Sequence, residues 1–146
     1  MEFKFRNVVL RDMGEADIED EIRWNTVETQ WAQWDAPWES LEALKSFDPA
    51  AHRRTELEQL KKPKPEIRNT LELDTEDGVH IGSVASYFVD QDFNWISKTQ
   101  PGQTRFRALG LDISESRYWG KGLGTQALTA WILYLGAWGA GAVPAD

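Results

Sequence analysis

Residues 118–132 read YWGKGLGTQALTAWI and place three glycines immediately before a helical pattern. Glycine loses the most backbone freedom on folding, so three at alternate positions, Gly120, Gly122 and Gly124, require a local reason. The unpaired amides in the first turn of a helix point outward and attract anions, provided that no side chain blocks the approach. The stretch therefore predicts a phosphate-binding loop at the start of a helix.

Two common phosphate-binding patterns do not fit this loop. A Walker A loop requires Gly-Lys followed directly by Ser or Thr, but Lys121 is followed by Gly122. The dinucleotide fingerprint matches formally at Gly122, Gly124 and Ala127, yet the acidic residue expected roughly 20 positions later would lie at the very end of the chain. The loop therefore belongs to a different strand-loop-helix arrangement.

The rest of the chain predicts a mixed α/β order in one domain, residues 1–146. A first strand is predicted over residues 3–10, followed by a helix whose acidic cap is Asp12, with Glu15 three residues on. Two short helices are predicted over residues 38–46 and 49–61, because Pro49 excludes helical conformation at the residue before it.

The second half of the chain predicts a hairpin, a further strand and a last helix. Residues 67–89 alternate in the manner of a β-hairpin, and residues 106–113 form a fourth strand. The last helix carries an apolar stripe at helical spacing. Its members are Ala127, Leu128, Trp131, Ile132 and Leu135.

The composition limits the kinds of partner that we expect the protein to bind. A net charge of −8 argues against nucleic acid, whose phosphates bind Lys and Arg, and is favourable for a cationic amine. The N-terminus lacks the apolar segment of a secretory signal, and no run of 18 apolar residues occurs, so we expect a cytoplasmic protein that does not enter a membrane. Without cysteine, and with His52 and His80 far apart in sequence, no metal site is predicted.

The glycine loop resembles the pyrophosphate-binding motif of the GNAT superfamily of N-acetyltransferases, usually written R/Q-x-x-G-x-G/A. Gly122 and Gly124 match its two small positions, whereas Trp119 stands where the family has Arg or Gln. The sequence YWGKGLGTQAL is similar to the corresponding sequences of the branch that acetylates ribosomal-protein N-termini, antibiotics and other amines. The predicted element order also resembles that fold, a mostly antiparallel sheet flanked by helices.

The resemblance implies an acetyl-CoA-dependent N-acetyltransferase in which a small-molecule or peptide amine attacks the thioester directly. It implies that Leu111, Asp112 and Ile113 of the fourth strand contact the pantetheine arm. It also implies that the loop and the first helical turn surround the pyrophosphate, through Trp119, Gly120, Lys121, Gly122, Leu123, Gly124 and Thr125.

Two side-chain groups have both a functional and a structural interpretation. Asp112 is the carboxylate nearest the implied opening and a candidate general base, but strand aspartates also face solvent or hold loops. Trp34, Asp35 and Trp38 are candidates for holding a cationic acceptor, because tryptophan faces attract cations. Tryptophans at this spacing also pack in cores, which we favour for Trp31 and Trp34.

Family members continue past the motif helix with further strands, whereas here Leu135 is followed by GAWGAGAVPAD. We expect that the C-terminal part of the fold is missing, that activity is impaired, and that the fourth strand has an exposed edge. Exposed edges recruit partners, which predicts a homodimer that covers this edge. A non-catalytic α/β binding protein, in which the glycines only turn the chain, stays open as the alternative function.

Overall fold

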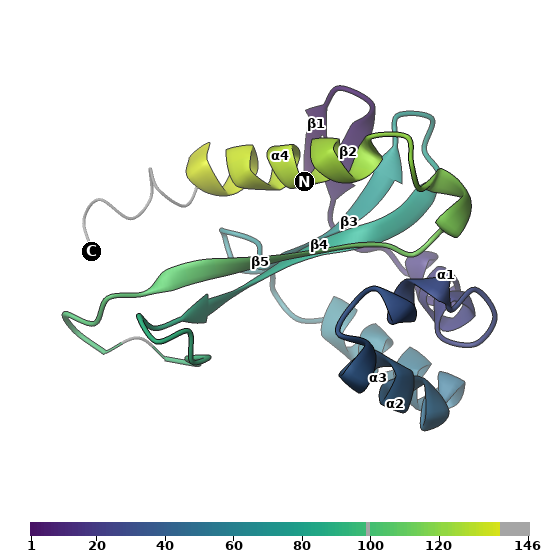
Figure 1. Cartoon of the computed structure of the whole chain (residues 1–146), viewed down its shortest axis with the longest axis horizontal. Helices are drawn as coiled ribbons and strands as arrows, with labels where there is room; N and C mark the ends of the chain where they lie inside the picture. Colours follow the sequence, from purple (N-terminus) through teal and green to yellow (C-terminus); the bar gives the residue numbers. More distant parts are fainter. Residues whose placement is uncertain (99, 138–146) are drawn as a thin grey trace.

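The structure, a computed structural model, describes residues 1–98 and 100–137. It contains one five-stranded antiparallel sheet in the order β1-β2-β3-β4-β5, with α4 on one face and α1, α2 and α3 on the other (Figure 1). The predicted α/β class is confirmed. The elements are β1 (Glu2–Phe5), β2 (Val8–Arg11), α1 (Asp17–Trp24), η1 (Gln30–Gln33), α2 (Pro37–Lys45), α3 (Pro49–Leu60), β3 (Thr70–Thr75), β4 (His80–Val89), β5 (Phe106–Ile113), η2 (Ser116–Tyr118) and α4 (Leu123–Leu135).

The N-terminal segment forms two strands, so the prediction of a single strand over residues 3–10 is wrong. Arg6 adopts a positive φ of 50° and turns the chain back, which pairs Phe3 with Leu10 and Phe5 with Val8. Apolar residues on both sides of a short polar turn gave the sequence the look of one continuous strand. The hairpin places Arg11, at the end of β2, beside β3.

The predicted hairpin and fourth strand are confirmed. β3 and β4 are joined through Gly78, which has a φ of 85° that favours glycine. β5 occupies the predicted residues and pairs with β4 from Phe106 to Ile113. Within the described residues β5 has a strand partner on one side only, so its other edge is open, as expected.

The first helix starts later than predicted. α1 begins at Asp17, and Asp12 does not cap it, because the Asp12 carboxylate binds the amino group of Met1 and the guanidinium of Arg68. The two short helices α2 and α3 are confirmed, and Asp48 caps α3 by accepting hydrogen bonds from the first amides of that helix.

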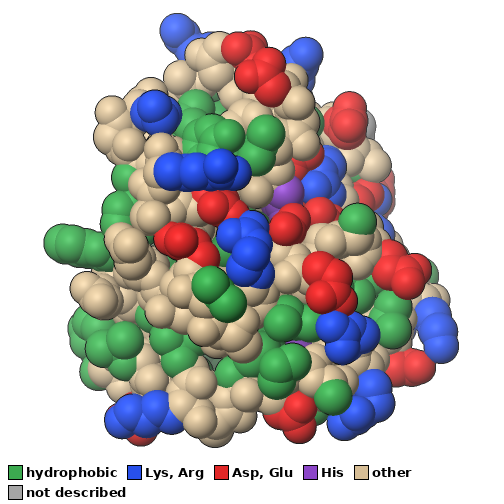
Figure 2. All heavy atoms as spheres, turned by 90° about the vertical axis from the view of Figure 1, so that its right-hand side faces the viewer, with side chains coloured by type: hydrophobic (Ala, Val, Ile, Leu, Met, Phe, Trp, Pro, Cys, Tyr) green, Lys and Arg blue, Asp and Glu red, His purple; other side chains and the backbone are tan. Residues whose placement is uncertain are grey.

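Charged side chains of both signs are interspersed on the surface, as Figure 2 shows for one face. On α3, for example, Arg53 pairs with Glu19 of α1, and Lys61 pairs with Glu58. The basic residues of this helix are thus locally balanced by acids. No helix of the described residues is long and apolar enough to cross a membrane.

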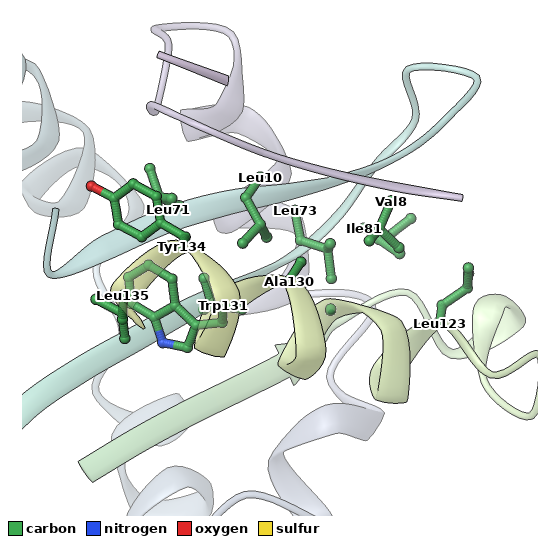
Figure 3. Packing of buried hydrophobic residues seen from close by; sticks show 12 residues of the cluster. Val8, Leu10, Leu71, Leu73, Ile81, Leu123, Ala130, Trp131, Tyr134 and Leu135 are labelled. Atoms are coloured by element: carbon green, nitrogen blue, oxygen red, sulfur yellow. The ribbon is translucent and has the colours of Figure 1, made fainter. Parts of the chain in front are cut away.

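The main core lies between α4 and the sheet. Figure 3 shows Ala130, Trp131 and Tyr134 of α4 directed toward Leu10 and Leu71 of the sheet. The helix is rotated relative to the predicted stripe, because Leu128 and Ile132 are exposed whereas Ala130 and Tyr134 are buried. Tyr134 also accepts a hydrogen bond from the amide of Arg68 at its hydroxyl, which explains why a polar residue lies in the core. The predicted absence of strand pattern after α4 concerns residues that lie mostly outside the described ones.

Gly82 is required where β4 approaches β5. A Cβ atom at this position would lie 1.9 Å from the carbonyl oxygen of Asp112, a distance that the backbone must relieve by moving. We expect Gly82→Ala to lower the free energy of unfolding by about 1–3 kcal/mol. Gly110→Ala is the matched control on the same strand pair, because its Cβ would meet nothing closer than 3.9 Å. Urea unfolding of both variants tests this, and an equal cost for both would contradict it.

Candidate functional site

The loop before α4 leaves backbone amides available. Gly122 is the residue before the helix, and no side chain caps it. The first hydrogen bond that closes the helix runs from the amide of Gln126 to the carbonyl of Gly122. Among the described residues no hydrogen-bond partner is found for the amides of Leu123, Gly124 and Thr125. These three amides can therefore donate hydrogen bonds to an external anion.

The glycines of this loop have two different roles. Gly120 and Gly122 have φ values of 73° and 78°, and a Cβ at either would meet nothing within 4 Å, so both border open space. Gly124 instead lies against β5, where a Cβ would lie 3.7 Å from the side chains of Leu111 and Ile113. The first two glycines keep the approach clear, and the third allows α4 to pack closely on the strand.

Trp119 joins the loop to the end of β5. Its indole nitrogen donates a 2.7 Å hydrogen bond to the carbonyl oxygen of Ile113. Trp119, at the position where the motif that the loop resembles has Arg or Gln, thus fixes the loop to the strand. Lys121 is exposed on the same loop and is the residue there that carries positive charge.

A cavity of about 410 Å³, here named the tryptophan cavity, lies beside the end of β5. It brings together candidate acceptor-binding residues near Trp34 and candidate coenzyme-binding residues of β5, which lie far apart in the sequence. Trp31 is fixed in its wall because the indole nitrogen donates to the carbonyl oxygen of Trp24 at 2.6 Å. The lining residues are Trp31, Trp34, Asp35, Leu111, Asp112, Ile113 and Trp119.

Asp112 faces Asp35 in this cavity. Burial raises the pKa of Asp112 to about 7, and a hydrogen bond with Asp35 and the charge of that carboxylate add to the effect. Two carboxyl groups in such close contact share a proton, since ionising both would place like charges together. At neutral pH the pair can accept a proton, which is the chemistry required of a general base.

Core packing, which we favoured for Trp34, is wrong: its side chain is 79% exposed. It forms part of the mouth of the tryptophan cavity. Trp38 is 75% exposed and does not line that cavity, although it lies nearby at the start of α2. Trp31 is intermediate, with its ring edge bonded to the backbone.

A second cavity of about 130 Å³, here named the inner cavity, adjoins the first beneath the sheet. It shares Trp31 and Asp112 with the tryptophan cavity. Its walls come from α1, β3, β4 and the end of β5. The lining residues are Glu21, Trp24, Asn25, Trp31, Glu72, Ser83, Asp112 and Ser114.

A third cavity of about 410 Å³, the outer cavity, continues from the inner one toward α3 and the segment before β3. The two share Glu21, Glu72 and Ser83. Glu56 of α3 also lines the outer cavity, and Lys64 and Arg68 stand in its wall. The inner and outer cavities are lined by Glu72 on the face of the sheet opposite α4, whereas the tryptophan cavity lies at the end of β5 and is lined by Leu111 and Ile113 as well as Asp112.

A network of buried ion pairs holds α1 against this face. The guanidinium of Arg11 donates to Asp17 of α1 at 2.7 Å and to Asp74 of β3 at 2.7 Å. His80 of β4 bonds to Asp20 through Nδ1 at 2.9 Å and to Glu72 through Nε2 at 3.1 Å. Burial opposes protonation of His80, but these two hydrogen bonds and the nearby carboxylates raise its pKa to about 9.

In the described part of the chain, the carboxyl group of Glu21 has no arginine beside it, unlike Asp17 and Asp74. Burial raises its pKa to about 8, with contributions from the charges of Glu72 and Glu56. Among the described residues its carboxylate bonds to the Nε2 atom of His52 on α3, at 3.1 Å. Glu21 therefore holds a proton at neutral pH unless a cation lies beside it.

Two clusters have the geometry of cation ligands, and each contains one of the histidines. They are Asp17, Asp20 and His80, and Glu21, His52 and Glu56. In the first, the raised pKa keeps His80 protonated and Arg11 already neutralises Asp17, so the donor set does not suit a metal ion. The second cluster borders the outer cavity through Glu21 and Glu56.

Sequence reasoning missed the residues that α1 and β3 contribute. Glu72 and Asp74 alternate with leucines and look like the solvent face of a hairpin, yet both are buried. The signal that distinguishes them is the supply of partners elsewhere in the chain, Arg11 and His80, which only the tertiary structure brings together. Glu115 is likewise buried and bonded to Trp24 and Arg23 of α1.

Comparison with known proteins agrees with this architecture. A family model described as an acetyltransferase (GNAT) domain matches residues 7–140. The crystal structure of a GNAT-family acetyltransferase from Bacillus anthracis is similar with a TM-score of 0.56 and 12% sequence identity, covering 94% of this chain and 67% of that chain. No curated protein sequence matches the chain.

The pKa values of His80 and Glu21 predict lower stability at alkaline pH. A pKa of about 9, raised from 6.5, means that His80 stabilises the fold fully below pH 6.5 and stops doing so as the pH rises through 9. Glu21 acts in the same direction, because its ionisation below pH 8 occurs more readily in the unfolded chain. We expect the free energy of unfolding to fall by about 1–3 kcal/mol between pH 6.5 and 9.

Urea unfolding across this pH range measures the fall. His80→Gln removes the titrating group and is expected to reduce the slope of stability against pH, even if it is less stable at every pH. An unchanged slope in this variant would show that His80 does not cause the pH dependence.

Proposed function

Since the chain belongs to the GNAT acetyltransferase family, we propose that it transfers an acetyl group from acetyl-CoA to a primary amine by direct attack. The observation that carries the proposal is the pairing of an open amide cluster at α4 with a cavity at the end of the same strand, β5. The first suits the diphosphate of a coenzyme, and the second suits an acceptor. Acetyl-CoA, when bound, would supply the activated acetyl group, with the C–S bond of its thioester breaking as the C–N bond to the amine forms and coenzyme A leaving as the free thiol.

The loop and first turn of α4 fit the coenzyme's diphosphate. The amides of Leu123, Gly124 and Thr125 have no hydrogen-bond partner in the described part of the chain, and the space before Gly120 and Gly122 is open. The positive end of the helix dipole and the ammonium group of Lys121 favour negative charge at this point. Trp119 supports the loop rather than contacting the phosphates through a charge.

The open edge of β5 supports binding of the pantetheine arm. Alternate backbone groups of an edge strand point away from the sheet and can bond an extended ligand, so the arm would run along Leu111, Asp112 and Ile113 and bond only alternate residues among them. The carbonyl of Ile113 already accepts a hydrogen bond from Trp119. A homodimer across this edge stays a prediction. Such a dimer is compatible with coenzyme binding only if it uses the other end of the strand, where Phe106 and Leu109 are exposed.

Asp112 is the proposed proton acceptor. It lies in the tryptophan cavity beside the strand edge, and burial together with the neighbouring Asp35 raises its pKa to about 7. An acceptor enters as an ammonium ion and must lose a proton before its nitrogen can attack. The exposed face of Trp34 at the mouth of the cavity attracts such a cation. A peptide or small-molecule amine satisfies these requirements equally.

Coenzyme binding is tested with Gly122→Val. We expect the wild-type chain to bind acetyl-CoA in calorimetry and the variant to lose this binding, because side-chain bulk would enter the space before the helix. Valine also strains a backbone with positive φ, so Gly78→Val is the matched control. Gly78 has a φ of 85° and equally open surroundings, but lies in the β3–β4 turn.

Retained binding by Gly122→Val, or equal loss in Gly78→Val, would contradict the assignment of the loop. Failure of the wild-type chain to bind acetyl-CoA at millimolar concentration would instead favour the non-catalytic alternative.

The pH profile of acetyl transfer tests Asp112. Because the carboxylate must be ionised to accept a proton, kcat/KM should rise with pH through about 7, and Asp112→Asn should lower it by about 10²–10⁴-fold. Asp35→Asn removes the hydrogen bond and charge that raise the pKa of Asp112, so the acid limb should move to lower pH. Asp92→Asn, an exposed control between β4 and β5, should leave the profile unchanged. An acid limb unmoved by Asp35→Asn would exclude this pairing.

A further inference from the structure

The tryptophan cavity does not end at Asp112. It adjoins the inner cavity through Trp31 and Asp112, and the inner cavity adjoins the outer one through Glu21 and Glu72. A ligand whose reacting amine lies at Asp112 stands at the wall common to the first two cavities, and a chain that passes this wall would extend between α1 and the strands. The family resemblance and the proposed reaction require only the first part of this space.

The inner cavity is acidic along its length. Asp112 stands at one end and Glu21 and Glu72 at the other, and no Lys or Arg is among its lining residues in the described part of the chain. Positive side chains appear only beyond it, in the outer cavity, where Arg68 is already paired with Asp12. A neutral or anionic extension of the ligand would gain nothing from these walls.

The two glutamates differ in the partners that the protein provides for their negative charge. Glu72 receives a hydrogen bond from His80, whereas the side-chain partner of Glu21 in the described part of the chain is His52 of α3. Burial and the charges of Glu72 of β3 and Glu56 of α3 raise the pKa of Glu21, and the charge on His80 opposes them. An ammonium group placed here would relieve repulsion among carboxylates as well as pair with Glu21.

The volume limits what can carry this second charge. The inner cavity measures about 130 Å³, which admits a methylene chain with an ammonium group but not a peptide segment with its side chains. Trp24 and Trp31 line it together with the carboxyl groups, and their rings suit alkyl and ammonium groups alike. Small size, aromatic walls and excess acid together describe a linear aliphatic diamine.

We propose that the acceptor is a short linear diamine or polyamine, with one amine at Asp112 and a second ammonium group held in the inner cavity by Glu21 and Glu72. The inference rests on the proposed function for the identity of the reacting end, but the binding of a dication can be measured without any coenzyme. A peptide N-terminus or a monoamine would use the tryptophan cavity alone.

Calorimetry with 1,4-diaminobutane and butylamine tests the proposal. The two ligands have the same carbon chain and differ in the second ammonium group. We expect the diamine to bind about tenfold more tightly or better, corresponding to roughly 1.4 kcal/mol. At pH 7 it should also release more protons than butylamine, because a cation beside Glu21 lowers the pKa of a carboxyl group that is otherwise about 8. Titrations in two buffers of different ionisation enthalpy measure this release.

Glu21→Gln separates a specific site from general attraction to an acidic protein. The variant should lose the preference for the diamine and the additional proton release. Glu58→Gln removes the same charge from an exposed position on α3, where Glu58 pairs with Lys61, and should retain both. Equal binding of the two ligands by the wild-type chain, or equal effects of the two variants, would overturn the proposal.

These experiments distinguish failure of the diamine proposal from failure of the proposed acetyl transfer. Diamine binding that depends on Glu21, without any binding of acetyl-CoA, would support the cation site and reject the acetyl transfer. Coenzyme binding with no preference for a second ammonium group would do the reverse.

Discussion

The guanidinium group of Arg11 determines how the helical layer meets the sheet. It bonds Asp17 of α1 and Asp74 of β3 at the same time, from the last residue of β2. Three elements distant in sequence are thereby fixed at one point, and removal of the cation would leave two buried carboxylates facing each other without compensation. His80 repeats the arrangement one strand further, between Asp20 and Glu72. The cavities lie where these two bridges hold α1 beside the strands.

The opposite face of the sheet is built by apolar burial instead. Trp131 and Tyr134 pack α4 over Leu10 and Leu71, and Gly124 permits the start of the helix to touch β5. β5 therefore belongs to both layers: Leu111 and Ile113 contact α4, while Asp112 lines the cavities on the other side. The alternation of side chains along one strand explains how the glycine loop and Asp112, the proposed proton acceptor, come to lie at the same strand end.

Local patterns were sufficient to predict most elements, the order in which they occur and the position of the glycine loop directly before the last helix. They failed where the outcome depended on distant partners. Residues 3–10 form two strands because Arg6 adopts a positive φ, and Glu72 is buried because His80 and α1 cover it. Asp35 and Asp112 were each selected for a separate reason, but their contact in one cavity could not be derived from a separation of more than seventy residues. Periodicity identifies faces, whereas ion pairs between layers decide which polar face is buried.

The acids of this face differ in whether an arginine pairs with them, and this difference distinguishes carboxyl groups that hold the fold together from those that we propose to bind a ligand. Asp17 and Asp74 are paired with Arg11, and Glu115 is paired with Arg23, so each belongs to an ion pair that joins two elements of the fold. Asp112 and Glu21 lack such a cation, and the same burial raises their pKa values to about 7 and 8. A buried acid without a cation destabilises the fold when it ionises, so its retention beside a cavity is most simply explained by a ligand that brings the missing charge. Both uncompensated acids border the inner cavity, which makes a positively charged ligand the natural complement of this face.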